Sequence, residues 1–160
     1  MAIYETGLSA NQANYAPLTP LDFLERSAAV YPNHTAMIHG DWSYTYSEFY
    51  DRCRQLASAI SSRGIGKGDT VSIMAPNVPA LLEGHFGVPM CGAVLNALNT
   101  RLDAETIAFI LDHGECKLLI TDREYSGIIK RALEIATVTP IVIDIDDPMA
   151  DGGDLIGEMT

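Results

Sequence analysis

The stretch that decides the fold of this chain is GDTVSIMAPNVPALLEGHFGVPMCGAVLNALNTRLDAETIAFILDHGECKLLITD, residues 68–122. It contains three short apolar runs, at 71–74, 93–95 and 118–120, and a helical stretch separates each run from the next. Connections of about a dozen residues indicate parallel strands, because parallel neighbours need a long crossover. The runs are apolar on both faces, as in a sheet that helices cover on each side. The sequence therefore predicts an α/β fold with an open parallel sheet.

The sequence before this stretch predicts a helix, a β-hairpin and a second helix. The first helix begins in TPLD at 19–22, with Thr as the N-cap and Pro at the first helical position. The hairpin strands lie at 35–39 and 42–44, joined by a Gly-Asp turn at 40–41. The second helix begins in TYSE at 45–48, which fits a capping box.

The sequence after the central stretch continues the same alternation. A helix is expected over 125–136 and a fourth parallel strand over 140–143. The expected organisation therefore has three parts. These are an irregular N-terminal segment at 1–18, an α/β subdomain at 19–145 and an acidic, linker-like tail at 146–160.

The composition is that of a globular protein with a large excess of acid. Of the 160 residues, 48% are hydrophobic, which suffices for one domain with its own core. The formal net charge of −11 argues against nucleic acid or an anionic membrane as a partner. Residues 141–160 contain acids but no base, so we expect them to lie in solvent.

The cysteines and the longest apolar run bear on the cellular compartment. Cys53, Cys91 and Cys116 are far apart and form no C-x-x-C pair, so reduced thiols and a cytoplasmic location are expected. No basic region followed by an apolar one begins the chain, so no secretory signal is expected. The run from Phe86 to Leu95 is too short to span a bilayer.

Two sequence patterns resemble ligand loops but have simpler interpretations. Residues 64–68 read G-I-G-K-G, yet a strand rather than a helix follows them, which favours the end of a helix running into a strand. Residues 147–158 match a calcium loop in part, but Met149 stands at the third position and a strand precedes the loop. Neither pattern predicts a phosphate or metal site.

The best polar candidates for a binding site follow the second parallel strand. Asn99 and Arg101 lie in the segment NALNTR at 96–101, and open α/β sheets place ligands at the carboxyl ends of their strands. In the alternative interpretation, Asn99 only orders the loop and Arg101 pairs with the acidic start of the next helix. Among the histidines, His85 is the one whose position in a helix is most worth following, although a packing or capping role is favoured.

Six segments occur in fixed order: WSYTYSEF at 42–49, GIGKGDTVSI at 64–73, APN at 75–77, GAVLNALNTRL at 92–102, IAFIL at 107–111 and LLITD at 118–122. This series resembles the N-terminal part of AMP-forming acyl-CoA synthetases, members of the adenylate-forming superfamily. The series covers residues 19–143, and within the superfamily it looks most like bacterial medium-chain fatty acyl-CoA ligases, including those acting on methylmercaptopropionate.

The resemblance implies a parent enzyme that joins a carboxylic acid to ATP, with Mg, and then transfers the acyl group to CoA. The family's catalytic motifs are a Ser/Thr/Gly-rich loop ending in Pro-Lys-Gly, a Tyr-x-x-Thr-Glu, a Thr-Gly-Asp and a Lys in a mobile C-terminal domain. None of them occurs in this chain. We therefore expect a truncated fragment that holds one subdomain of a larger N-terminal domain. Alone it should be inactive, with no catalytic residue, cofactor or metal, and it could self-associate through an exposed apolar surface.

Two other hypotheses stay open on the sequence alone. The chain could be a stand-alone, non-catalytic binding or interaction domain on the same subdomain. It could also be an unrelated flavodoxin-like or dinucleotide-binding domain, although no G-x-G-x-x-G follows the first parallel strand.

Overall fold

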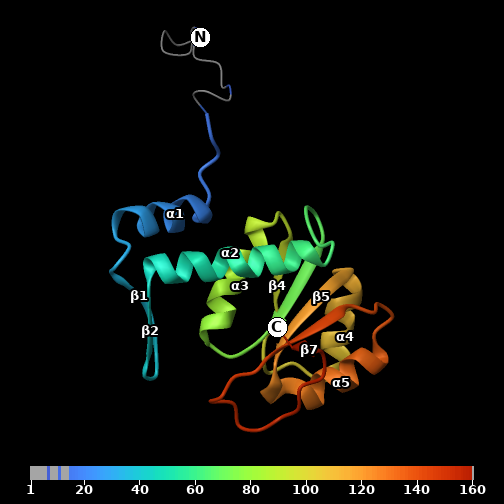
Figure 1. Ribbon diagram of the computed structural model, residues 1–160. Coiled ribbons are helices and arrows are strands. Elements are labelled where there is room, and N and C mark those ends of the chain that lie inside the picture. The colour runs from blue at the N-terminus through green and yellow to red at the C-terminus, as the bar shows by residue number, and fades with distance from the viewer. Residues whose placement is uncertain (1–6, 8–10, 12–14, 160) are drawn as a thin grey trace.

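The computed structural model describes residues 7, 11 and 15–159 of the chain. Its centre is a parallel sheet of five strands: β3 (Thr70–Met74), β4 (Val94–Ala97), β5 (Cys116–Asp122), β6 (Ile141–Ile145) and β7 (Glu158–Met159). Their spatial order is β4-β3-β5-β6-β7 (Figure 1). The predicted open parallel sheet is confirmed, and the short strand β7 adds a member that the sequence did not indicate.

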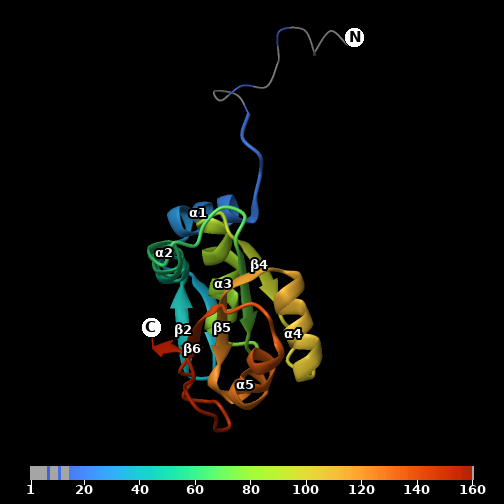
Figure 2. The same cartoon turned by 90° about the vertical axis from the view of Figure 1, so that its right-hand side faces the viewer.

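Helices cover both faces of the sheet, as predicted. The connecting helices are α3 (Pro79–Met90), α4 (Ala104–His113) and, after a 3₁₀ turn at Arg123–Tyr125, α5 (Ser126–Ile135); α2 (Tyr46–Ser62) precedes the sheet. Figure 2 shows α2 and α4 on opposite sides of the strands.

Each face of the sheet has its own hydrophobic core. Val71, Ile73 and Leu118 pack on the side of α2 and α3, whereas Leu119 packs with Ile129 on the side of α4 and α5. The alternation follows from the period of two along each strand. The parallel strands therefore hold the two helical layers together.

The N-terminal elements form a second, smaller unit beside the sheet. They are α1 (Pro20–Val30) and an antiparallel hairpin of β1 (Thr35–His39) and β2 (Trp42–Thr45). The predicted helix start is confirmed, with Thr19 as the N-cap of α1. Phe49 of α2 meets Phe86 of α3 edge-on, with ring centroids 5.5 Å apart, beneath this unit. Aromatic packing thereby fixes the hairpin end of α2 to α3.

The predicted capping box at the start of α2 is also confirmed. The Thr45 hydroxyl accepts from the Glu48 N–H at 3.3 Å, and the Glu48 carboxylate accepts from the Thr45 N–H at 2.8 Å. These two bonds satisfy backbone donors that the helix itself leaves free. They fix the point at which the hairpin turns into α2.

The contact between α2 and α3 depends on a glycine. A Cβ atom at Gly87 would lie 3.0 Å from the Cys53 carbonyl oxygen and 2.9 Å from Cδ2 of Leu56. The absence of a side chain therefore lets the two helix backbones approach closely. At Gly127 in α5, by contrast, a Cβ would meet nothing within 4 Å.

We predict that Gly87→Ala destabilises the fold by about 1–3 kcal/mol, because the added methyl group overpacks the contact between α2 and α3. The matched variant Gly127→Ala should stabilise it by up to about 1 kcal/mol, through helix propensity alone. Urea unfolding of both variants measures the difference. Equal effects of the two substitutions would contradict the close packing described above.

Candidate functional site

The order of the strands defines where a ligand crevice would lie. The chain passes from β3 to β4 on one side and from β5 to β6 on the other, so the connections diverge between β3 and β5. In open α/β sheets, ligands bind outside the carboxyl ends of the strands at such a switch point. The polar residues at these strand ends are therefore the ones to assess.

The loop after β4 places the two predicted site residues at this edge. Leu98 is buried, and its N–H donates to the Ile73 carbonyl oxygen at 2.8 Å, which attaches the loop to β3. Asn99 and Arg101 are both exposed. The Asn99 side-chain oxygen accepts from the Arg101 N–H at 2.9 Å, as in an Asx turn. Asn99 thus orders the loop whether or not it also binds a ligand.

Arg101 does not behave as the alternative interpretation supposes. Asp103 is the N-cap of α4, and its carboxylate accepts from the Thr106 N–H at 2.8 Å. Within the described part of the chain, Arg101 makes no ion pair with this helix start. Its guanidinium group is therefore available at the carboxyl edge of the sheet.

A buried carboxylate at the end of β5 was missed by the sequence analysis. Asp122 is 0% exposed; one of its oxygens accepts from the Glu124 N–H at 2.9 Å, and the other has no partner among the described residues. Burial raises the pKa of the Asp122 carboxyl group, and nearby Asp147 raises it further. The sequence feature that could have indicated this buried acid is its position directly after the apolar run LLIT at 118–121.

The acidic stretch after residue 141 does not lie wholly in solvent, which corrects the expectation above. Asp144 and Asp147 are buried, and the Asp144 carboxylate accepts from the N–H groups of Ile156 and Gly157 at 2.7 and 2.6 Å. These bonds bring the tail back along β6, where β7 joins the sheet. A carboxylate can be buried at low cost when backbone N–H groups satisfy it. The domain boundary at 145/146 stays a prediction.

Further polar contacts attach the tail to α5 and to the 3₁₀ turn. Arg123 donates to Asp146 at 2.8 Å and to the Gly153 carbonyl oxygen at 3.1 Å. Lys130 pairs with Asp154 at 2.9 Å, and both side chains are largely exposed. The tail is therefore attached by several groups, of which the Asp144 carboxylate is the most buried.

We predict that Asp144→Ala releases the tail and lowers stability by about 1.5–3 kcal/mol, because two hydrogen bonds to a buried charge are lost. Hydrogen exchange at Ile156 and Gly157 should become faster. As a control, Lys130→Ala removes only the exposed pair with Asp154 and should change stability far less. Unchanged exchange at both amides in the Asp144 variant would refute this role.

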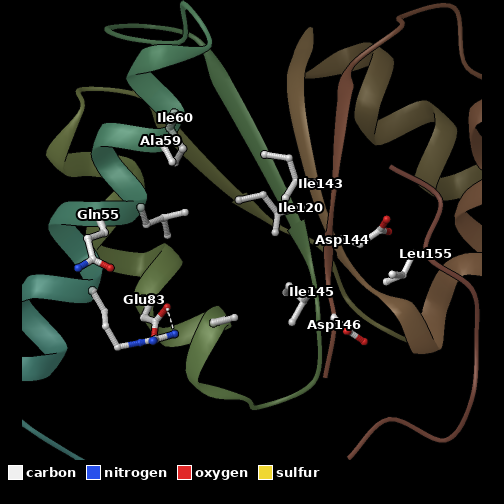
Figure 3. Close-up of a pocket in the computed structure, with 13 residues that line it drawn as sticks. Gln55, Ala59, Ile60, Glu83, Ile120, Ile143, Asp144, Ile145, Asp146 and Leu155 are labelled. Carbon is white, nitrogen blue, oxygen red and sulfur yellow. Dashed lines mark hydrogen bonds and ion pairs between the residues drawn. The ribbon is translucent and has the colours of Figure 1, made fainter. Parts of the chain in front are cut away.

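A groove of about 560 Å³ lies between α2, α3 and the strands β5 and β6 (Figure 3). Ile120, Ile143 and Ile145 project into it from the sheet, whereas Asp144 points to the other side of β6. The groove exists because α2 and α3 leave this part of the sheet face partly uncovered. It therefore offers an apolar floor on the α2–α3 side.

An ion pair between a half-exposed arginine and a buried glutamate closes one end of this groove. Glu83 of α3 is only 6% exposed, and the Arg52 guanidinium of α2 donates to both of its carboxylate oxygens. The same guanidinium lies 5.0 Å from the centre of the Tyr44 ring. A buried carboxylate needs such a partner, because an unpaired charge would be costly. The pair thus stabilises the contact between α2 and α3.

The remaining sequence candidates have structural roles in the described part of the chain. Gly64 and Gly68 adopt positive φ values of 78° and 89° between α2 and β3, as expected for a helix end. His85 bonds through Nδ1 to the Leu81 carbonyl oxygen at 2.8 Å within α3. Among the described residues, no three His, Cys, Asp or Glu side chains come together as metal ligands. No described helix combines the length and hydropathy of a membrane span.

Comparison with known proteins identifies the family. The model of the AMP-binding enzyme family matches residues 24–157. An acetate/butyrate–CoA ligase of Arabidopsis thaliana, named as peroxisomal, is 52% identical over 123 residues, which cover 77% of this chain and 22% of that protein. An acetate–CoA ligase of Humulus lupulus is 47% identical over 151 residues, covering 90% and 27%.

Solved structures agree with these relatives. A fatty acyl-CoA synthetase of Mycobacterium tuberculosis has a TM-score of 0.72 at 25% identity, over 84% of this chain and 30% of that one. A benzoate–CoA ligase of Burkholderia xenovorans has a TM-score of 0.73 at 25% identity, over 81% and 26%. The chain spans about a quarter of the length of the curated relatives it matches, from 22% to 28%.

These matches decide between the sequence hypotheses. They contradict an unrelated flavodoxin-like or dinucleotide-binding domain, because both the family model and the relatives cover most of the chain. The names of the relatives confirm the resemblance to AMP-forming acyl-CoA synthetases. The chain belongs to the AMP-binding enzyme family.

Proposed function

We propose that this chain is the scaffold part of a longer ATP-dependent carboxylate–CoA ligase. Such an enzyme joins a carboxylic acid to ATP, releasing pyrophosphate, and then passes the acyl group from the adenylate to the CoA thiol, releasing AMP. The observation that carries the proposal is the family match over residues 24–157, with about half of the positions identical in acid–CoA ligases.

Within that enzyme, we propose that Asn99 and Arg101 line a ligand channel. Their support is the position of the loop at the carboxyl edge of the sheet and the free guanidinium group of Arg101. The described residues fit ATP poorly, because the glycines at 64–68 end a helix and do not begin one. The phosphates of ATP, its Mg and CoA would therefore be held mainly by other parts of the enzyme.

The substrate and the location are narrower proposals. The relatives described above are named for acetate, butyrate, benzoate and fatty acids, which supports a monocarboxylic acid as substrate. A medium-chain acid stays a prediction. A cytoplasmic location is supported by the free cysteines Cys53, Cys91 and Cys116. Burial raises the pKa of the Cys53 thiol to about 12, which suits a structural rather than a reactive residue.

We predict that the purified 160-residue chain releases no AMP above background from ATP, CoA and octanoate, acetate or benzoate. Each missing electrostatic donor costs about 10²–10³-fold in rate, and the sequence lacks the phosphate loop and the motifs described above. The assay measures AMP by chromatography, with the acetate–CoA ligase of Humulus lupulus as positive control. Robust AMP release by the pure chain would overturn the scaffold role.

We further propose that the groove is an interaction surface of the subdomain. In the parent it would pack against another part of the enzyme, and in the isolated chain it would join two copies. The support is the apolar floor formed by Ile120, Ile143 and Ile145 on a partly covered sheet face.

Light scattering over a range of concentrations tests this self-association. The mass should rise above the 17.3 kDa of one chain as concentration increases. Ile145→Lys, at the half-buried edge of the floor, should restore the monomer because a charge is costly in an apolar contact. Ile38→Lys, on the exposed hairpin outside the groove, should not. A strict monomer at every concentration would rule the surface out.

A further inference from the structure

Two buried acids lie at the carboxyl edge of the sheet, at the ends of neighbouring strands. β5 ends at Asp122, and Asp147 follows two residues after the end of β6. The two strands are in register there, because Asp122 pairs with Ile145, the last residue of β6. Asp122 is 0% exposed and Asp147 is 8% exposed. We call these two residues the acid pair.

The acid pair is held by short turns of its own backbone. Oδ1 of Asp122 accepts from the Glu124 N–H at 2.9 Å, and Oδ1 of Asp147 accepts from the Met149 N–H at 2.9 Å. Oδ2 of Asp122 is buried and has no partner among the described residues. An ionised Asp122 would therefore be a buried charge that is satisfied on one oxygen only, which is costly.

The charges near Asp122 do not compensate an ionised carboxylate. Three groups act on it, namely Asp147 of the tail and, in the 3₁₀ turn, Arg123 and Glu124. Two of the three are acidic. The Arg123 guanidinium donates to Asp146 and to a backbone carbonyl oxygen of the tail, so it is already engaged.

The neighbouring elements supply no further partner for Asp122 in the described part of the chain. β3, on the other side of β5, contains no charged residue. Charged groups on the other elements around the sheet are bonded elsewhere: Asp144 of β6 to tail amides, Asp103 to its own helix α4, Lys130 of α5 to Asp154, and Arg52 of α2 to Glu83 of α3.

We propose that the acid pair is a proton-sensitive attachment point for the acidic tail. With a proton on Asp122, the carboxyl group is neutral and can donate as well as accept, so it tolerates burial beside Asp147. When that proton leaves to solvent, two carboxylates lie together in a buried site and repel each other. The tail, to which Asp147 belongs, is then held less tightly against the sheet. The proposal is independent of the proposed CoA-ligase function.

The sign of the pH dependence follows from these contacts. Burial raises the pKa of the Asp122 carboxyl group and the charge of Asp147 raises it further, although the hydrogen bond from the Glu124 N–H opposes the shift in part. An acid with a raised pKa holds its proton more tightly in the closed form than in the open one. Attachment of the tail should therefore weaken as the pH rises from about 4, the ordinary value for Asp, through the raised value.

The first test measures the pKa of Asp122 in the 160-residue chain from carboxyl carbon-13 shifts by NMR. The pKa should lie above that of an ordinary Asp. Asp147→Asn keeps the acceptor for the Met149 N–H but removes the charge, so it should lower the pKa of Asp122. Asp151→Asn is the matched control, because it removes the same charge from an exposed position of the tail and should leave that pKa almost unchanged.

The second test reads the tail through amide exchange at Met149 and Ile156. After correction for the intrinsic pH dependence of exchange, protection should fall as the pH rises from above the isoelectric point of about 4.5, by up to about tenfold for each unit by which the pKa is raised. Asp122→Asn keeps the acceptor for Glu124 and stays neutral, so its tail should remain protected at every pH.

Three outcomes would overturn the proposal. The first is an Asp122 that titrates at or below the ordinary value for Asp. The second is an Asp147→Asn variant that changes the pKa of Asp122 no more than Asp151→Asn does. The third is protection of the tail that depends on pH in the same way in Asp122→Asn and in the unmodified chain.

Discussion

The rest of the structure depends on the burial of strand β5 on both faces. Its residues from Leu118 to Asp122 are all buried, and it lies between β3 and β6 in the sheet. Leu118 and Ile120 face α2 and α3, whereas Leu119 faces α4 and α5. A parallel strand of this kind is stable only if helices cover each side. The burial of β5 therefore requires both helical layers.

The two layers cover the sheet unequally, and the interaction surface follows from this difference. On one side α4 and α5 pack with β5, and Asp144 on that side of β6 binds the returning tail. On the other side the close contact at Gly87 holds α2 against α3, and the Arg52–Glu83 pair closes it. The isoleucines of β6 are then left at the edge of a groove. The groove is thus a consequence of how closely α2 and α3 pack against each other at Gly87.

The sequence predicted those features that depend on neighbours along the chain. The apolar runs of β3 and β5, the N-cap at Thr19 and the capping box at Thr45 are local signals, and the structure contains each of these elements. The Arg52–Glu83 pair joins residues 31 positions apart, and no local pattern selects one partner from the many bases of the chain. A strand of two residues such as β7 is too short to be recognised from its sequence pattern.

The candidate site was less predictable than the fold for a related reason. The loop of Asn99 could be placed because strand ends follow from topology, yet no local pattern shows that Asp122 is buried with Asp147 near it. The number of acids in the tail likewise suggests that the tail lies in solvent. Asp144 is buried, and one of its two carboxylate oxygens, Oδ2, accepts from two backbone N–H groups of its own chain. The number of charges in a segment predicts exposure to solvent only where no backbone N–H group is available to a carboxylate. A tail that turns back along its own strand provides such N–H groups.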